Sequence, residues 1–303
     1  MVERVSTWDS IGTVVDGATT TSQVLEQADL KFNVVKKPLY VVDGNKQILV
    51  PGKVATVRDD TDQILGVVSD NYQICQNESA FDFIDTVSSD ITFVKAGMTQ
   101  TGLIYIIGKL PETTVLGDTF TPYLIFQTSH NGRYTLKTTI CPLRIVCNNQ
   151  FATAFRNSPN TISIQHSAQL TTKMAQAVEL LSDTATYMKN FTNTAEELAL
   201  LRVGNDANVQ SIINSFFDST KEITERQKRL IEESKTQFIT AYNSDDNANF
   251  RGTAWGMING FTDYLTHKSV KKTSNADENK FMRVTFDNTL LQNFMNHVMA
   301  NVV

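Results

Sequence analysis

Two cations and two hydroxyl side chains alternate along one short segment of the sequence. Arg133, Thr135, Lys137 and Thr139 occupy every second position, and alternate residues of a strand point to the same face of a sheet. The residues between them are mostly apolar, which predicts a strand over 134–141 with one buried face. Two cations and two hydroxyl groups on the other face are donors that suit an anion, above all a phosphate.

A second group of donors follows directly, on a helix that the spacing of apolar residues predicts over 143–156. Pro142 precedes this helix, and proline is tolerated in a first helical turn. The free N–H groups and the positive dipole end of a helix start favour an anion. The polar side of the predicted helix carries Arg144, Asn148, Asn149 and Arg156. We expect both groups of donors, together with Lys173, to contact the phosphates of a nucleic acid.

These donors lie in a stretch from Thr119 to Val178 that contains no Asp or Glu. The stretch has five Lys or Arg residues (+5), whereas the rest of the chain has 22 basic and 32 acidic residues (−10), which gives the net charge of −5. Carboxylates beside a phosphate backbone repel it, so their absence favours a nucleic-acid contact. A buried, β-rich core would also lack acids, because it lacks surface. The composition leaves both interpretations open.

No other pattern in the sequence indicates catalysis or a bound cofactor. The glycines and lysine within 102–110 have the wrong spacing for a phosphate-binding P-loop. The four histidines are scattered, without the spacing of a zinc site, and the three cysteines form no pairing pattern. We therefore expect no cofactor, no metal and no enzymatic activity. A metal-dependent nuclease remains an alternative, although no carboxylates at a usable spacing support it.

The elements that position the donors fall into two classes along the chain. Paired strands are predicted over 91–96, 103–109, 123–128 and 134–141, with Asn131-Gly132 as a tight hairpin turn. Helices are predicted over about 167–189, from a capping box at Thr194, and over 208–217, 220–242, 250–266 and 287–301. We expect an α+β fold with two domains. Residues 1–165 form a β-rich domain with an antiparallel sheet, a β-β-β-α core and the nucleic-acid-binding face, and residues 166–303 form a helical region.

The sequence also indicates the cellular compartment in which the protein is expected. The first residues show no charged segment followed by an apolar one, so we expect no signal peptide. No apolar run approaches the ~20 residues of a membrane span, and an odd number of cysteines is typical of free thiols in a reducing compartment. We expect a cytoplasmic protein without a membrane partner. A basic cluster within 267–283 is predicted to lie in a mobile loop between the last two helices.

Several segments resemble a known family. They are LKFNVVKKPLY, GKVATVRDDTDQILGVVSDNYQICQNESAFDFID, TTICPLRIVCNNQFATAF and RGTAWGMINGFTDYLTH, in this order. Together they resemble the phage/plasmid-like family of domains of unknown function, over roughly residues 5 to 300. The most specific pieces are Arg144 to Asn149 and Thr253 to Gly256. The resemblance implies a phage or plasmid origin and a bacterial cytoplasmic location, and it implies no settled activity.

A looser likeness links the predicted architecture to phage single-strand annealing proteins of the Red-beta, RecT and eukaryotic annealing-recombinase type. Those proteins share a curved sheet followed by a helix, assemble into rings or filaments, and hold DNA in a basic groove. The predicted strands and the 143–156 helix are compatible with that β-β-β-α core. The likeness concerns architecture alone, and fold does not imply function. The acidic net charge and the modestly basic face depart from that group.

Two functional hypotheses follow. The first is a non-enzymatic, homo-oligomeric protein of a phage or plasmid that binds single-stranded DNA and anneals complementary strands, with phage or host replication and recombination proteins as further partners. Annealing needs no nucleotide hydrolysis, which agrees with the missing P-loop. The second hypothesis is a protein-interaction or structural accessory of a phage or plasmid that binds no nucleic acid. The acidic body of the chain and its amphipathic helices suit the second hypothesis.

Overall fold

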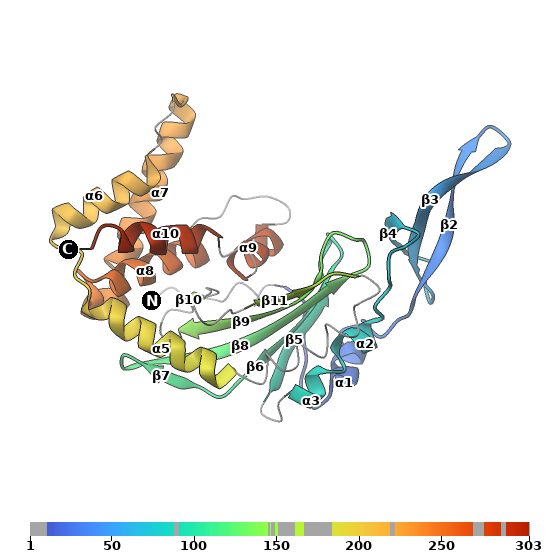
Figure 1. Cartoon of the computed structure of the whole chain (residues 1–303), viewed down its shortest axis with the longest axis horizontal. Helices are drawn as coiled ribbons and strands as arrows, with labels where there is room; N and C mark the ends of the chain where they lie inside the picture. The colour runs from blue at the N-terminus through green and yellow to red at the C-terminus, as the bar shows by residue number, and fades with distance from the viewer. Residues whose placement is uncertain are drawn as a thin grey trace.

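The computed structural model shows a mixed α+β fold, as the sequence predicts, with antiparallel sheets before residue 165 and helices after it (Figure 1). The structure describes residues 11–87, 91–144, 146, 149–150, 161–166, 184–218, 222–268, 276–285 and 289–302. The division into domains at 165 stays a prediction. One apolar core extends across that boundary, because Phe120 of the sheet packs on Phe191 of a later helix, with ring centroids 5.3 Å apart.

The main sheet is antiparallel, with the strand order β1-β5-β6-β8-β9-β10; β7 pairs with β8 and β11 pairs with β9. Its strands are β1 (Thr13–Val14), β5 (Thr92–Met98), β6 (Leu103–Lys109), β7 (Thr113–Val115), β8 (Asp118–Ser129), β9 (Leu136–Arg144), β10 (Asn149–Gln150) and β11 (Thr161–Ile164). The four predicted strands correspond to β5, β6, β8 and β9, which confirms this part of the prediction.

Both faces of the main sheet are covered. On one face Ile104, Ile106 and Phe126 belong to the main core, which also contains buried residues of α1 (Thr21–Gln27), α2 (Asn77–Phe81), α3 (Ile84–Val87) and α5 (Thr184–Leu200). On the opposite face Tyr105 packs against Phe281 of α9 (Ala276–Thr285), with ring centroids 5.1 Å apart. A sheet buried on both faces has little room for charge. The acid-free stretch therefore coincides, over most of β8 and β9, with a buried core.

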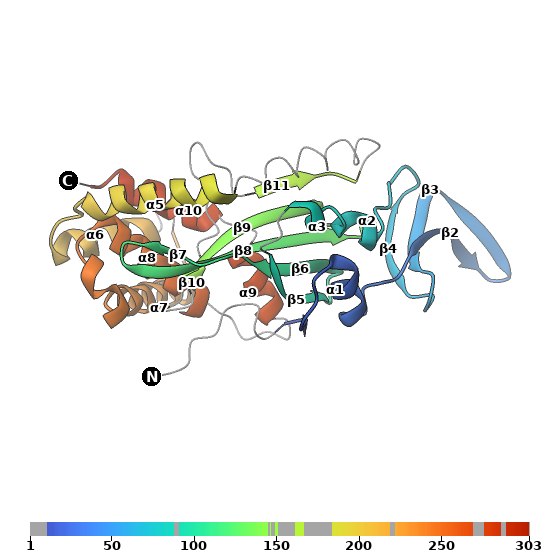
Figure 2. The ribbon, with the colours of Figure 1, turned by 90° about the horizontal axis from the view of Figure 1, so that it is seen from below.

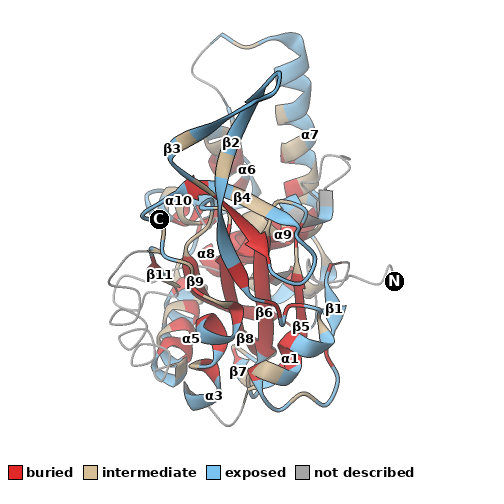
Figure 3. Cartoon of the chain, turned by 90° about the vertical axis from the view of Figure 1, so that its right-hand side faces the viewer, coloured by how far each residue is buried: buried red, intermediate tan, exposed pale blue. Residues whose placement is uncertain are grey.

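A smaller sheet, β2-β3-β4, lies at one end of the main sheet. It consists of β2 (Val34–Asp43), β3 (Lys46–Arg58) and β4 (Ile64–Ser69). The hairpin of β2 and β3 projects well beyond the rest of the chain (Figures 1 and 2). We call its projecting residues, 36–54, the arm. Figure 3 shows the arm as mostly exposed, in contrast to the buried strands behind it. The turn at its tip uses Gly44, whose φ of +58° is unfavourable for other residues.

The C-terminal half is helical and lies at the other end of the molecule (Figure 1). Besides α5 and α9, it contains α6 (Asp206–Phe217), α7 (Glu225–Tyr242), a short 3₁₀ turn (Asp245–Phe250), α8 (Ala254–Asp263), a π turn (Tyr264–Lys268) and α10 (Thr289–Met299). The helices predicted over 208–217, 220–242, 250–266 and 287–301 are thereby confirmed in outline. The helix start predicted at Thr194 is wrong, because α5 continues through it.

The helix predicted over 143–156 is also wrong where the structure describes it. Residues up to Arg144 continue β9, and β10 then pairs back on Arg144. Pro142 lies inside β9 and faces Pro122 of β8. Pro122 O accepts a hydrogen bond from Leu110 N at 2.9 Å, so its backbone points away from β9 and the two prolines form a non-hydrogen-bonded pair. Neither ring removes a bond between β8 and β9, so the strand tolerates both.

Candidate nucleic-acid interface

The alternation predicted for β9 is correct, but the polar face it carries is only partly open. Leu136, Thr138 and Ile140 face the main core, while Lys137 and Thr139 point to the α9 side. Thr139 is 1% exposed. Both hydroxyls that the sequence nominates hydrogen-bond to the neighbouring strand β11: Thr135 Oγ1 to Ser163 Oγ at 2.7 Å, and Thr139 Oγ1 to Thr161 Oγ1 at 3.2 Å. These hydroxyls therefore join β9 to β11, and Lys137 is half-buried beside them.

Arg144 does not lie on a surface. It is 2% exposed, and its Nε and Nη2 donate to Asp118 Oδ2 at 2.9 and 2.6 Å. Nη2 also donates to Asp246 O at 2.7 Å, and the guanidinium lies 5.7 Å from the ring centre of Phe250. The expected helix start that would have presented Arg144 to a phosphate is absent from the described residues, since Arg144 ends β9. In this structure Arg144 links the sheet to the turn before α8.

Most of the remaining residues that the sequence predicts to bind nucleic acid are not among those that the structure describes. Asn148, Arg156 and Lys173 lie outside the described residues. Asn149 is placed through its backbone, as the first residue of β10 opposite Arg144. Their contacts with a nucleic acid stay predictions.

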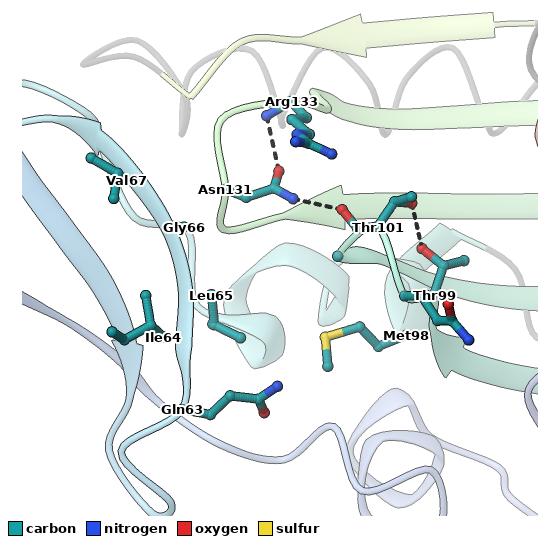
Figure 4. A pocket seen from close by; sticks show the side chains of 12 residues that line it. Gln63, Ile64, Leu65, Gly66, Val67, Met98, Thr99, Thr101, Asn131 and Arg133 are labelled. Atoms are coloured by element: carbon teal, nitrogen blue, oxygen red, sulfur yellow. Dashed lines mark hydrogen bonds between the residues drawn. The ribbon is translucent and has the colours of Figure 1, made fainter.

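Arg133 is the nominated cation that the structure places at an open site. It is exposed and borders a cavity of about 600 Å³ between β4 and the turns at the end of the main sheet (Figure 4). The cavity is lined by Gln63, Ile64, Leu65, Gly66, Val67, Met98, Thr99, Gln100, Thr101, Gly102, Asn131 and Arg133. None of these residues is acidic. Arg133 therefore gives the Arg133 cavity, as we call it, a net positive charge among amide and hydroxyl groups.

Asn131 organises the turns around the Arg133 cavity. Its Oδ1 accepts a hydrogen bond from Arg133 N at 2.9 Å, and its Nδ2 donates to Thr101 O at 2.7 Å (Figure 4). An Asn side chain that bonds the backbone two residues on is a common way to close a turn. Gly132 follows with a φ of +72°, a conformation that glycine adopts without strain. The predicted Asn-Gly turn thus fixes the backbone of Arg133 and ties it to the turn between β5 and β6.

The smaller sheet forms the opposite wall and is packed closely against the same turn. A Cβ on Gly66 of β4 would lie 2.6 Å from Asn131 Cα, so only glycine allows this approach. Thr56 Oγ1 donates to His130 O at 2.7 Å, and Tyr72 Oη donates to Ser129 O at 2.9 Å. These contacts join the base of the arm to the β8–β9 turn and keep the Arg133 cavity in shape.

Two histidines, the buried His130 and the half-buried His166, lie at the turn and are neutral near pH 7. His130 is 1% exposed, and its Nε2 hydrogen-bonds to Asn77 Oδ1 at 2.8 Å. Burial, with a smaller effect from His166, lowers the pKa of His130 to about 4. Burial also lowers the pKa of His166, which stacks on Tyr72 with ring centroids 5.1 Å apart. The positive charge at the lining of the Arg133 cavity therefore comes from Arg133 and not from the imidazoles.

The cysteines of known placement offer no activated thiol. Cys75 and Cys141 are both buried and unpaired by disulfide. Burial raises the pKa of Cys75 to about 11, so its thiol is protonated near pH 7 and weakly nucleophilic. Within the described ranges, no group of three or more His, Cys, Asp or Glu side chains is placed to hold a metal ion. The arrangement at Arg133 is suited to binding an anion.

Much of the Arg133 cavity comes from residues that the sequence does not single out. Residues 63–67, at the start of β4, and 98–102, at the end of β5 and in the turn after it, carry no motif, and they meet Asn131 only through the fold. The basic cluster within 267–283 is predicted to lie in a loop. Its residues from 276 onward belong instead to α9, whose Phe281 is buried. The described part of the chain contains no helix long and apolar enough to cross a bilayer.

The comparisons with known proteins identify the family. A family model described as a domain of unknown function, DUF932, matches residues 64–285. The protein belongs to the DUF932 family. The DUF932 match begins with the first residue of β4 and ends with the last residue of α9, so it contains Asn131 and Arg133 and leaves the arm outside. No curated protein and no solved structure matches the chain.

Proposed function

We propose that this DUF932 protein binds single-stranded DNA through the Arg133 cavity and anneals complementary strands as a homo-oligomer, without catalysis. The observation that carries the proposal is the exposed guanidinium of Arg133 at a cavity with no acidic lining residue. Guanidinium groups donate two parallel hydrogen bonds to a phosphate, and the amide group of the exposed Gln100 is a typical partner of phosphate and sugar.

The size and place of the Arg133 cavity favour a single strand. Its volume of about 600 Å³ lies in the range of sites for one small ligand, about 300–1,000 Å³, which suits one phosphate with its sugar better than a duplex. The half-buried Lys137 lies on β9, the strand that follows the Arg133 turn, on the side of the sheet that faces α9. Because α9 covers the rest of this side, Lys137 can contribute only at the end of β9 next to the Arg133 turn, as a second positive charge near the cavity.

Three further points support annealing, a phage or plasmid origin and a bacterial cytoplasmic location. The antiparallel strands β5, β6, β8 and β9 are the predicted strands that are compatible with the sheet of single-strand annealing proteins, although the helix expected to follow them from residue 143 is not found in the described residues. Annealing requires that strands be held and released, and it needs no nucleotide hydrolysis. The segments quoted above resemble a phage/plasmid-like family. The proposed partners are single-stranded DNA, further copies of the chain in a ring or filament, and replication or recombination proteins of the phage or host.

Binding of a fluorescent single-stranded oligonucleotide over a series of salt concentrations tests the proposal. We expect Arg133→Ala to weaken binding equally across sequences and to reduce the slope of log K against log salt by about one. Arg226→Ala is the matched control, because Arg226 is an exposed arginine at the far, helical end and its loss changes the net charge equally. A wild-type protein that fails to bind the oligonucleotide at low salt would refute the proposal.

The second candidate function is that of an interaction protein, and the exposed apolar side chains of the arm favour it. Tyr40, Val41 and Ile48 are 48%, 54% and 52% exposed, whereas nucleic-acid contacts are mostly polar and basic. Isolation of the protein from its host with one stoichiometric partner protein and without DNA would support this second function.

A further inference from the structure

The arm exposes apolar side chains on both of its faces. The β2–β3 register pairs Tyr40 with Leu49 and Val41 with Ile48, so the first pair lies on one face and the second on the other. All four side chains are between 48% and 54% exposed, and Val42 is 69% exposed. An element that simply rests on a surface buries one face. The arm has apolar side chains on both faces, and a strand that pairs with its edge would place further side chains beside those of each face.

The edges of the arm are open as well. β2 pairs with β3 alone among the described strands. At its base Val34 N donates to Gln76 Oε1 at 2.8 Å and Val34 O accepts from Gln76 Nε2 at 2.9 Å, so the edge without a strand partner begins after Val34. β4 reaches only residues 53–57 of β3, which leaves the distal part of β3 without a neighbour on that side. Exposed edges of this kind are templates for pairing with another strand.

The arm is basic, whereas the segment that follows it is acidic. Residues 36–54 contain four lysines and one aspartate, a net charge of +3. Residues 59–90 contain eight Asp or Glu and no Lys or Arg, a net charge of −8. The acids of that segment whose exposure the structure describes, such as Asp70 and Asp82, are exposed. Asp62 and Asp60 already pair with Lys37 and Arg58 of the same chain. The other exposed acids of the segment leave an excess of negative charge, which repels a phosphate backbone and attracts a second basic arm.

We infer that the arm joins two copies of this chain: β2 pairs with β2 of a second copy in antiparallel orientation. This arrangement makes one continuous sheet from two arms, and it places the tip of each arm beside the base of the other. Lys46 at the tip then lies near the acidic segment, residues 59–90, of the second copy. The contact is two-fold symmetric, so each copy supplies both the lysine and the acids.

The inference deepens the homo-oligomeric part of the proposed function, and it requires no nucleic acid. The base of the arm is already held by Gly66 and Thr56 against the β8–β9 turn, so the arm is presented to its partner from a fixed base. Preorganisation of this kind lowers the entropic cost of association.

The mass of the full-length protein in solution, measured without DNA, tests the inference. We expect at least twice the chain mass of 33.8 kDa for the wild type, and the mass of one chain for the double variant Val42→Glu/Ile48→Glu. Leu200→Glu is the matched control, because Leu200 is 81% exposed and lies at the end of α5, far from the arm; its mass should equal that of the wild type. Circular dichroism checks that each variant is folded.

A second variant keeps the test decisive if the first one fails to fold. Lys46→Glu changes only the charge at the tip, and it should raise the monomer fraction at low salt, with a smaller difference from the wild type at high salt. A wild type of one chain mass, or an arm variant that retains the wild-type mass, overturns the inference. An arm variant that keeps its mass and loses oligonucleotide binding assigns the arm to DNA instead. Arg133→Ala should lose oligonucleotide binding at unchanged mass, which separates failure of the proposed function from failure of this interface.

Discussion

Replacing Arg144 by alanine tests whether this residue stabilises the fold or binds a ligand. The substitution removes the donor of two hydrogen bonds to Asp118 Oδ2, at 2.9 and 2.6 Å, and of one to Asp246 O at 2.7 Å. Removal of one partner from a buried ion pair costs about 3–5 kcal/mol. The side chain of Asp118 is 24% exposed, so water compensates for part of the loss. We expect a decrease in the free energy of unfolding of about 3 kcal/mol, at the lower end of that range.

Urea unfolding followed by circular dichroism measures this effect. With a dependence on urea of roughly 3 kcal/mol per molar, the midpoint of Arg144→Ala should fall by about 1 M. Arg144→Lys should recover only part of the loss, because an ammonium group lacks the planar fork of the guanidinium. Arg133→Ala is the control and should keep the wild-type midpoint. The reasoning is refuted if Arg144→Ala unfolds at the wild-type midpoint and yet binds an oligonucleotide more weakly, since Arg144 would then be a ligand-binding residue.

Two further predictions concern the turn beneath the Arg133 cavity. Because the folded-state pKa of His130 is about 4, below its ordinary 6.5, its contribution to stability is complete above about pH 6.5 and is lost as the pH falls toward 4. Between pH 7.5 and 5 this amounts to about 2 kcal/mol; urea midpoints at the two pH values should show the loss, and His130→Gln should reduce the difference. Gly66→Ala should destabilise the protein by about 1–3 kcal/mol and weaken oligonucleotide binding, because its Cβ would displace Asn131. Val67→Ala, at an exposed residue of the same strand, should leave the free energy of unfolding nearly unchanged, and equal losses of stability from the two substitutions would contradict the steric explanation.

The parts of the fold that the sequence predicts correctly depend on local patterns. Alternation over 134–141 predicts β9 because strands have a period of two and one face is apolar. The Asn131-Gly132 pair predicts a turn because glycine adopts the positive φ found there. Arg133, at the end of this pattern, is the predicted residue that the structure places at the cavity. These features need no knowledge of distant residues.

The wrong predictions depend on contacts between distant segments. Pro142 resembles a helix start in isolation, and it continues a strand because Pro122 faces it across the sheet. Arg144 resembles a surface donor, and it is buried because Asp118, at the start of β8, supplies its counter-ion. The lysines near α9 indicate a solvated loop in isolation, and α9 is a helix there because its Phe281 packs against the second face of the sheet. In each case a tertiary partner overrides the local preference.

The close packing of Gly66 against Asn131 has a mechanical consequence. Gly66 and Thr56 contact the β8–β9 turn directly, and Asn131 of that turn accepts a hydrogen bond from Arg133 N. We therefore expect a partner bound to the arm and a ligand bound at Arg133 to change each other's affinity. Such coupling is reciprocal: whatever factor one bound partner applies to the affinity of the other is applied equally in the reverse direction.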